Sequence, residues 1–181
     1  MREKIQVLAE SDVVASDGTF NIRPKLKKKW RQVYSLHSYV NGTFIPTVVT
    51  YMTSKSTRAY KQMFTSLKEW IHANVKTEEG EPVVWEPKYW LTDFESGVFS
   101  AVHSMWPGTA QKGCYFHFTK SIWAKVQEKG LAKAYNKDIA VNETVRMVKV
   151  LPLVPTAAIA QSVQHIITKI NTDPALANYR T

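Results

Sequence analysis

Residues 32–52 read QVYSLHSYVNGTFIPTVVTYM, two runs rich in β-branched and aromatic residues on either side of Asn41 and Gly42. An Asn-Gly pair between such runs predicts a hairpin, because both residues tolerate the positive φ that a tight type I′ turn requires. We therefore expect antiparallel strands over 33–40 and 44–52. A short apolar run just upstream supplies an adjacent strand, so the front of the chain is predicted to be a three-strand meander.

Helices alternate with strands after this meander. The first signal is an amphipathic pattern behind Ser56 and Thr57, either of which is a candidate N-cap, with apolar residues at helical spacing. The patterns predict a helix after Ser56, a strand over 88–92, a helix over 98–105, a strand over 111–118, a helix over 121–129 and only helices beyond. A three-strand meander followed by two strands, each reached through a helix, is the ribonuclease-H-like order of elements. This is an α/β fold whose mixed five-stranded sheet is flanked by helices.

Composition indicates the class of partner. The 181-residue chain has 24 Lys and Arg against 15 Asp and Glu, a net charge of +9, which favours a polyanion, usually nucleic acid. A single cysteine excludes both a disulfide framework within the chain and a zinc site built from its cysteines. No segment is typical of a signal peptide or a membrane span, so we expect a soluble intracellular protein.

Two aspartates are candidates for metal chemistry. Asp17 lies in or just after the first strand, and Asp93 ends the fourth. If those strands are neighbours, the two carboxylates converge, and hard oxygen ligands of this kind suit Mg²⁺. Structural alternatives exist: Asp17 with Gly18 forms an ordinary tight turn, and Asp93 complements a helix N-terminus capped by Thr92 and Glu95. Spacing alone favours these alternatives, because such turns and caps are common.

Five strings in register change this balance. In order they are SDGTF at 16–20, QVYSLH at 32–37, the Asn41-Gly42 turn, LTDFE at 91–95 and KGCYFHFT at 112–119, and LPLVP follows at 151–155. Together they resemble the transposase domain of the Mutator-like element (MULE) family. Each string is weak by itself, but the ordered set is specific and runs through nearly the whole chain.

The resemblance implies a DDE-type enzyme, in which two aspartates and a glutamate bind two divalent ions, Mg²⁺ or Mn²⁺. Water attacks a phosphodiester at a transposon end, and the released 3′-hydroxyl attacks target DNA. Asp17 and Asp93 match the two aspartates and are the expected catalytic metal ligands. The implied partners are transposon-end and target DNA, with a homo-oligomer as the acting form, in the nucleus and without a membrane.

Cys114 and His117 match the Cys-x-x-His signature of the family. Two ligands do not close a tetrahedral zinc site, and on the predicted strand this spacing points the side chains to opposite faces. We expect His117 to approach the scissile phosphate as a catalytic residue and Cys114 to pack in the interior.

The sequence departs from the family pattern at the third carboxylate. In the family, a glutamate follows a long helical insertion, near a Glu-Gly-x-His segment that does not occur before Thr181. We assign none of the remaining glutamates: Glu95 is explained as a cap, and Glu128 and Glu143 as surface charges. The expected division is therefore an incomplete ribonuclease-H-like core over 1–135 and the beginning of the helical insertion over 136–181.

A basic stretch is a candidate DNA contact, because each phosphate that it neutralises adds salt-dependent affinity. An exposed loop or strand edge, where lysines discourage strand pairing, explains it equally well. Its members are Arg23, Lys25, Lys27, Lys28, Lys29 and Arg31. The sequence thus predicts a fragment of a cut-and-paste DNA transposase, inactive alone; the alternatives are a catalytically dead, transposon-derived DNA-binding protein and, less favoured, another ribonuclease-H-like nuclease.

Overall fold

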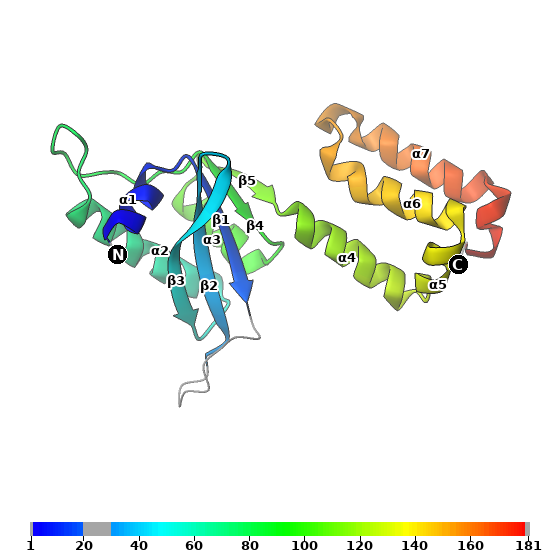
Figure 1. Cartoon of the computed structure of the whole chain (residues 1–181), viewed down its shortest axis with the longest axis horizontal. Helices are drawn as coiled ribbons and strands as arrows, with labels where there is room; N and C mark the ends of the chain where they lie inside the picture. Colours follow the sequence, from blue (N-terminus) through cyan, green and yellow to red (C-terminus); the bar gives the residue numbers. More distant parts are fainter. Residues whose placement is uncertain (1, 20–29, 180–181) are drawn as a thin grey trace. The chain divides into compact units, whose positions relative to one another are not determined.

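The computed structural model describes residues 2–19 and 30–179 (Figure 1). These residues form two compact units, Met1–Cys114 and Tyr115–Thr181. The division of the family core from its insertion near residue 135 stays a prediction. The boundary between the compact units, at Cys114, lies before residue 135, because the helix that follows Cys114 shares a hydrophobic core with the helices after it.

The first unit is built on a five-stranded sheet in the order β3-β2-β1-β4-β5. Its strands are β1 (Val13–Thr19), β2 (Gln32–Val40), β3 (Thr43–Met52), β4 (Tyr89–Thr92) and β5 (Ala110–Gly113). The first three pair antiparallel, whereas β4 is parallel to β1 and β5 is parallel to β4. This mixed sheet, flanked by helices, confirms the predicted ribonuclease-H-like fold.

The β2–β3 hairpin forms as its sequence predicts. Asn41 has a φ of 47° and Gly42 a φ of 84°, the left-handed values that a type I′ turn needs. Side chains of β2 then alternate between buried and half-buried, with Tyr34 and Leu36 facing the core. The turn therefore fixes which face of β2 is buried.

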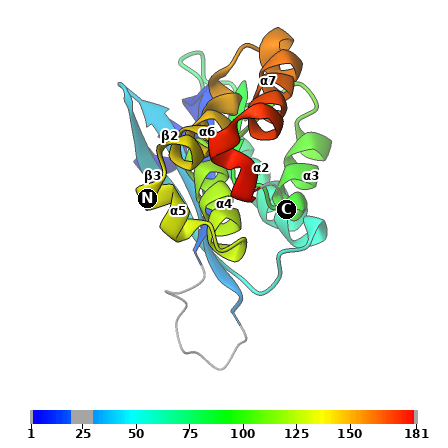
Figure 2. The same ribbon diagram turned by 90° about the vertical axis from the view of Figure 1, so that its right-hand side faces the viewer.

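Two helices cover that buried face, α2 (Thr57–Asn74) and α3 (Ser96–Met105), and they lie on the same side of β2 and β3 (Figure 2). Of the two N-cap candidates, the structure selects Ser56, whose side chain accepts a hydrogen bond from the Ala59 amide at 3.2 Å. Between helices and sheet, the Phe64 ring meets the Trp90 ring at 5.1 Å and the Trp106 ring at 5.3 Å. This aromatic cluster is the centre of the core.

The hydrophobic pattern of the sequence predicted the secondary structure incorrectly at two places. It missed α1 (Arg2–Glu10), whose Ile5 and Leu8 are buried in the core, because only a few apolar residues stand among its charged ones. The strand predicted over 111–118 is wrong beyond Gly113, since α4 (Tyr115–Glu128) begins at Tyr115. The aromatic residues after Cys114 favour a strand locally, but they continue into a helix of 14 residues.

The second unit is helical throughout its described part, residues 115–179, as predicted. After α4 come α5 (Ala132–Lys137), α6 (Ile139–Val150), η1 (Leu151–Leu153), η2 (Thr156–Ala158), α7 (Ile159–Thr172) and η3 (Pro174–Tyr179). Val126, Val141, Val145 and Leu176 form its core. None of the helices in the described ranges combines the length and apolar character that crossing a bilayer requires.

The aromatic cluster gives a test of the core. Phe64 is fully buried, so Phe64→Ala is expected to lower the free energy of unfolding by about 3–5 kcal/mol through lost burial and a cavity. Phe99→Ala on α3 is the matched control, because its ring is 40% exposed. Urea denaturation measures both, and equal losses would show that the cluster is not central.

Candidate active site

The parallel pairing of β1 with β4 brings the two candidate aspartates to one end of the sheet. Val14 pairs with Trp90 and Ala15 with Leu91, so Asp17 and Asp93 each lie two residues beyond the last pair. Neighbouring strands are about 4.8 Å apart. Both aspartates are half-buried and each follows a buried residue, Ser16 or Thr92. The expected adjacency of the first and fourth strands is confirmed.

The turn after β4 holds one oxygen of Asp93. Asp93 Oδ1 accepts a hydrogen bond from the Glu95 amide at 3.2 Å and another from Thr92 Oγ1 at 3.4 Å. The predicted capping role of the Glu95 side chain is wrong. Glu95 is the N-cap residue of α3, but its side chain makes no capping hydrogen bond. The capping role passes to the Asp93 carboxylate, which accepts the amide at the start of the helix.

The Glu95 carboxylate instead joins a polar network that is buried at Gln32 and Tyr60 and exposed at Lys55. Tyr60 Oη donates to Glu95 Oε1 at 2.6 Å, and Lys55 Nζ lies 3.1 Å from Glu95 Oε2. Gln32 Nε2 in turn donates to Tyr60 Oη at 2.6 Å. Burial, reinforced by the Glu95 carboxylate, raises the pKa of Tyr60 well above its ordinary value, although the Gln32 hydrogen bond opposes this. The hydroxyl therefore stays protonated and donates to Glu95.

Asp17 has polar neighbours on β2. It pairs directly with Ser35, whose Oγ donates to the Asp17 carbonyl oxygen at 3.4 Å. His37 Nε2 lies 3.0 Å from Ser35 Oγ. Ser35 and His37 were not among the residues predicted for the site. The alternation of β2 contained the signal, because it puts both on the face opposite the buried Tyr34 and Leu36.

Cys114 lies at the same end of the sheet as Asp93. Its amide donates to the Thr92 carbonyl oxygen at 2.8 Å, and the residue is a half-buried free cysteine. His117 is in the first turn of α4, in the second unit, with its ring centroid 5.6 Å from that of Phe116. The expectation that Cys114 and His117 occupy opposite faces of one strand is wrong, because His117 is helical. An approach of His117 to phosphate stays a prediction.

Of the residues in the basic stretch, Arg31 is the one that the structure describes. Arg23, Lys25, Lys27, Lys28 and Lys29 lie outside the described residues. Arg31 is exposed, and its amide donates to the Met52 carbonyl oxygen at 2.7 Å, at the end of the β2–β3 ladder. Its part in DNA contact therefore stays a prediction.

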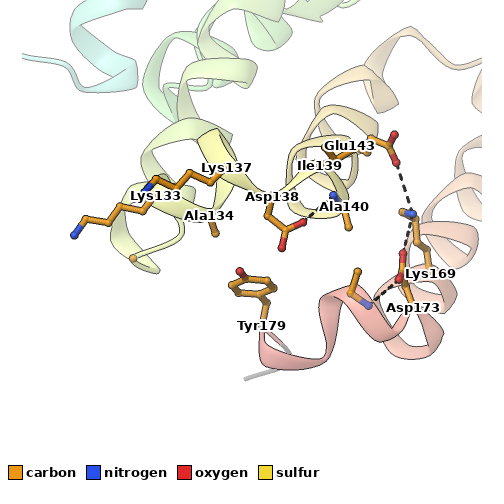
Figure 3. A pocket seen from close by; sticks show the side chains of 12 residues that line it. Lys133, Ala134, Lys137, Asp138, Ile139, Ala140, Glu143, Lys169, Asp173 and Tyr179 are labelled. Carbon is orange, nitrogen blue, oxygen red and sulfur yellow. Dashed lines mark hydrogen bonds and ion pairs between the residues drawn. The ribbon is translucent and has the colours of Figure 1, made fainter.

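The acidic residues of the second unit have structural roles. Glu128 Oε2 pairs with Lys125 Nζ at 2.7 Å on the surface of α4. Lys169 Nζ lines an open pocket of about 970 Å³ and lies 3.9 Å from Glu143 Oε2 and 3.1 Å from Asp173 Oδ2. Figure 3 shows Lys169 between these two carboxylates. In the same pocket Asp138 Oδ1 accepts from the Ala140 amide at 2.9 Å and caps α6. These carboxylates are explained as ion pairs and caps.

Over the described ranges, 2–19 and 30–179, no group of three or more His, Cys, Asp or Glu side chains is arranged to hold a metal ion. The two aspartates at the end of β1 and β4 carry carboxylate oxygens, which are hard donors.

Residues 13–121 match the model of the MULE transposase domain, from β1 into α4. The chain belongs to the MULE transposase family. The match covers more than half of the sequence and includes Asp17, Asp93, Cys114 and His117. Membership of a transposase family implies interaction with DNA. No curated protein matches the chain.

Gly97 gives a test of how tightly the Asp93 turn is held. A Cβ there would collide with the Lys55 carbonyl oxygen and lie 3.3 Å from Tyr60 Cε2. Gly97→Ala is therefore expected to destabilise the fold, although Gly→Ala within a helix ordinarily stabilises by about 0.5–1 kcal/mol. Gly108→Ala is the control, because no atom lies within 4 Å of its Cβ position. A stability gain at Gly97 in thermal melts would contradict this packing.

Proposed function

We propose that this chain carries part of the active site of a DDE-type, cut-and-paste DNA transposase, with Asp17 and Asp93 as metal-binding carboxylates. The observation that supports this most directly is the parallel β1–β4 register, which carries both aspartates to the same end of the sheet. Family membership supplies the substrate class, DNA.

The donor set fits Mg²⁺ or Mn²⁺. Both ions favour oxygen ligands, and Mg²⁺ is typically held by one or two carboxylates together with water and phosphate oxygens. Asp93 Oδ1 already accepts two hydrogen bonds, whereas none from the described residues reaches its Oδ2. That second oxygen is the one we assign to the ion. A complete site would hold two ions and a third carboxylate, the glutamate of the family pattern.

The chemistry is in-line phosphoryl displacement. Two bound ions stabilise the attacking and leaving oxygens of such a reaction. Asp17 and Asp93 would hold them against the scissile phosphate of a transposon end, where water is the nucleophile. Hydrolysis would break the P–O3′ bond and release a 3′-hydroxyl, which would then attack a phosphodiester of target DNA and displace its 3′ oxygen. From the family signature, we propose that His117 takes part in catalysis and that the basic stretch from Arg23 to Arg31 contacts DNA, with a homo-oligomer in the nucleus as the acting form.

A second candidate function is a catalytically dead DNA-binding protein. It is favoured by one observation: the described residues contain no third metal ligand beside the two aspartates. The net charge of +9 supports DNA binding in either case.

Substitution of either aspartate tests the metal site. Asp17→Asn and Asp93→Asn are each expected to lower Mn²⁺ affinity by more than about tenfold, or about 1.4 kcal/mol, because a neutral amide replaces a charged ligand. Water-proton relaxation during Mn²⁺ titration measures the affinity. Asp12→Asn is the control, since this exposed carboxylate pairs with Lys88 at 2.8 Å. Unchanged affinity in both site variants would reject the proposal.

DNA cleavage separates the two candidate functions. A chain extended to include the glutamate should nick DNA bearing the matching terminal repeat in Mg²⁺ or Mn²⁺, and the aspartate variants should not. Binding should persist in the variants and fall steeply as salt rises. Salt-sensitive binding without nicking by the extended wild-type chain would favour the catalytically dead protein.

A further inference from the structure

A chain of hydrogen bonds runs from the interior of the first unit to the carboxylate of Asp93. Gln32 Nε2 donates to Tyr60 Oη at 2.6 Å, and Tyr60 Oη donates to Glu95 Oε1 at 2.6 Å. The Glu95 amide then donates to Asp93 Oδ1 at 3.2 Å. The chain links β2, α2 and the β4–α3 turn, elements that are distant in sequence.

Burial makes the interior links of this chain strong. Gln32 is fully buried, Tyr60 is 1% exposed, and the Glu95 side chain is 18% exposed. A hydrogen bond to a charged acceptor is roughly twice as strong as a neutral one, and a low local dielectric strengthens it further. Tyr60 therefore holds the Glu95 side chain in one position.

Close packing fixes the same turn from a second side. Gly97, two residues after Glu95, lets the first turn of α3 approach the Lys55 carbonyl oxygen and Tyr60 Cε2. The Lys55 ammonium also lies 3.1 Å from Glu95 Oε2. With its side chain and the following turn both held, the Glu95 backbone amide has little freedom to move away from Asp93.

We propose that Tyr60 is a positioning residue for Asp93: through Glu95 it fixes the backbone amide that binds Asp93 Oδ1 and so leaves Asp93 Oδ2 in place for a divalent ion. The inference rests on the proposed function, because it requires Asp93 to bind metal. If Tyr60 only stabilised the core, its hydrogen bond to Glu95 would be sufficient. The hydrogen bonds continue beyond Glu95 to Asp93, a candidate metal ligand.

Tyr60→Phe tests the proposal, since it removes only the hydroxyl at the centre of the chain. We expect Mn²⁺ affinity to fall roughly tenfold, the lower end of the range for groups that orient metal ligands. Tyr34→Phe is the matched control. Tyr34 is also buried, and its ring packs edge-on against that of Tyr60 with centroids 5.0 Å apart. No hydrogen bond joins Tyr34 to the linked residues Gln32, Tyr60, Glu95 and Asp93. Its affinity should stay within about twofold of wild type, which is within the ordinary scatter of context effects.

Thermal melts without metal serve as the reference for both tyrosine variants. A loss of stability that Tyr60→Phe and Tyr34→Phe share, with wild-type Mn²⁺ affinity in both, would overturn the proposal. So would an equal loss of affinity in the two variants.

Variants of Glu95 keep the proposal testable if Tyr60→Phe does not fold. Glu95→Gln retains a carbonyl oxygen that can accept from Tyr60, so its Mn²⁺ affinity should exceed that of Glu95→Ala. In folded protein, adding Tyr60→Phe to Glu95→Ala should cause no further loss, because both act through one chain. Equal affinities in the Gln and Ala variants, or fully additive losses, would overturn the inference.

Asp93→Asn, measured in the same titration, distinguishes failure of the proposed metal site from failure of the positioning role of Tyr60. Wild-type affinity in Asp93→Asn would reject the proposed metal site itself. Weakened binding in Asp93→Asn together with unchanged binding in Tyr60→Phe would reject only the positioning role.

Discussion

The parallel pairing of β1 with β4 is the constraint on which the candidate site depends. It requires the chain to leave the β2–β3 hairpin, cross the sheet through α2 and return beside β1. The buried face of α2 makes this crossover stable by packing Phe64 against Trp90 of β4. Trp90 Nε1 also donates to Ser16 Oγ at 2.8 Å, directly beside Asp17. The same contacts that stabilise the core therefore align the two aspartates.

Local features of the sheet and helices were predictable from sequence. The positive φ at Asn41 and Gly42 and the Ser56 cap follow from residue chemistry, and hydrophobic period located α2. The start of α4 was not predictable, because Tyr115 and Phe116 favour a strand locally and only the longer segment forms a helix. Periodicity thus gave the fold, but not the point at which the chain passes from the sheet into the helical unit.

The site was only half predictable for a similar reason. Asp17 and Asp93 were identified from motifs, and strand adjacency was a consequence of the fold. The partners of Glu95 could not be predicted, because Tyr60 and Lys55 are distant from it in sequence and the residues around Glu95 suggest a capping role. A buried tyrosine and a buried glutamine carry no sequence signal that distinguishes them from ordinary core residues. Glu143 was interpreted from the sequence as a surface charge, and the structure adds its ion pair with Lys169.

If Asp17 and Asp93 bind one metal centre, as proposed, paramagnetic broadening by Mn²⁺ reports on both residues in a single experiment. In an NMR titration, the amide signals of both residues should broaden together at the same low Mn²⁺ concentration, before that of Asp12. Broadening of only one of the two signals, or of neither until exposed carboxylates such as Asp12 are affected, would show that Asp17 and Asp93 do not share a metal ion.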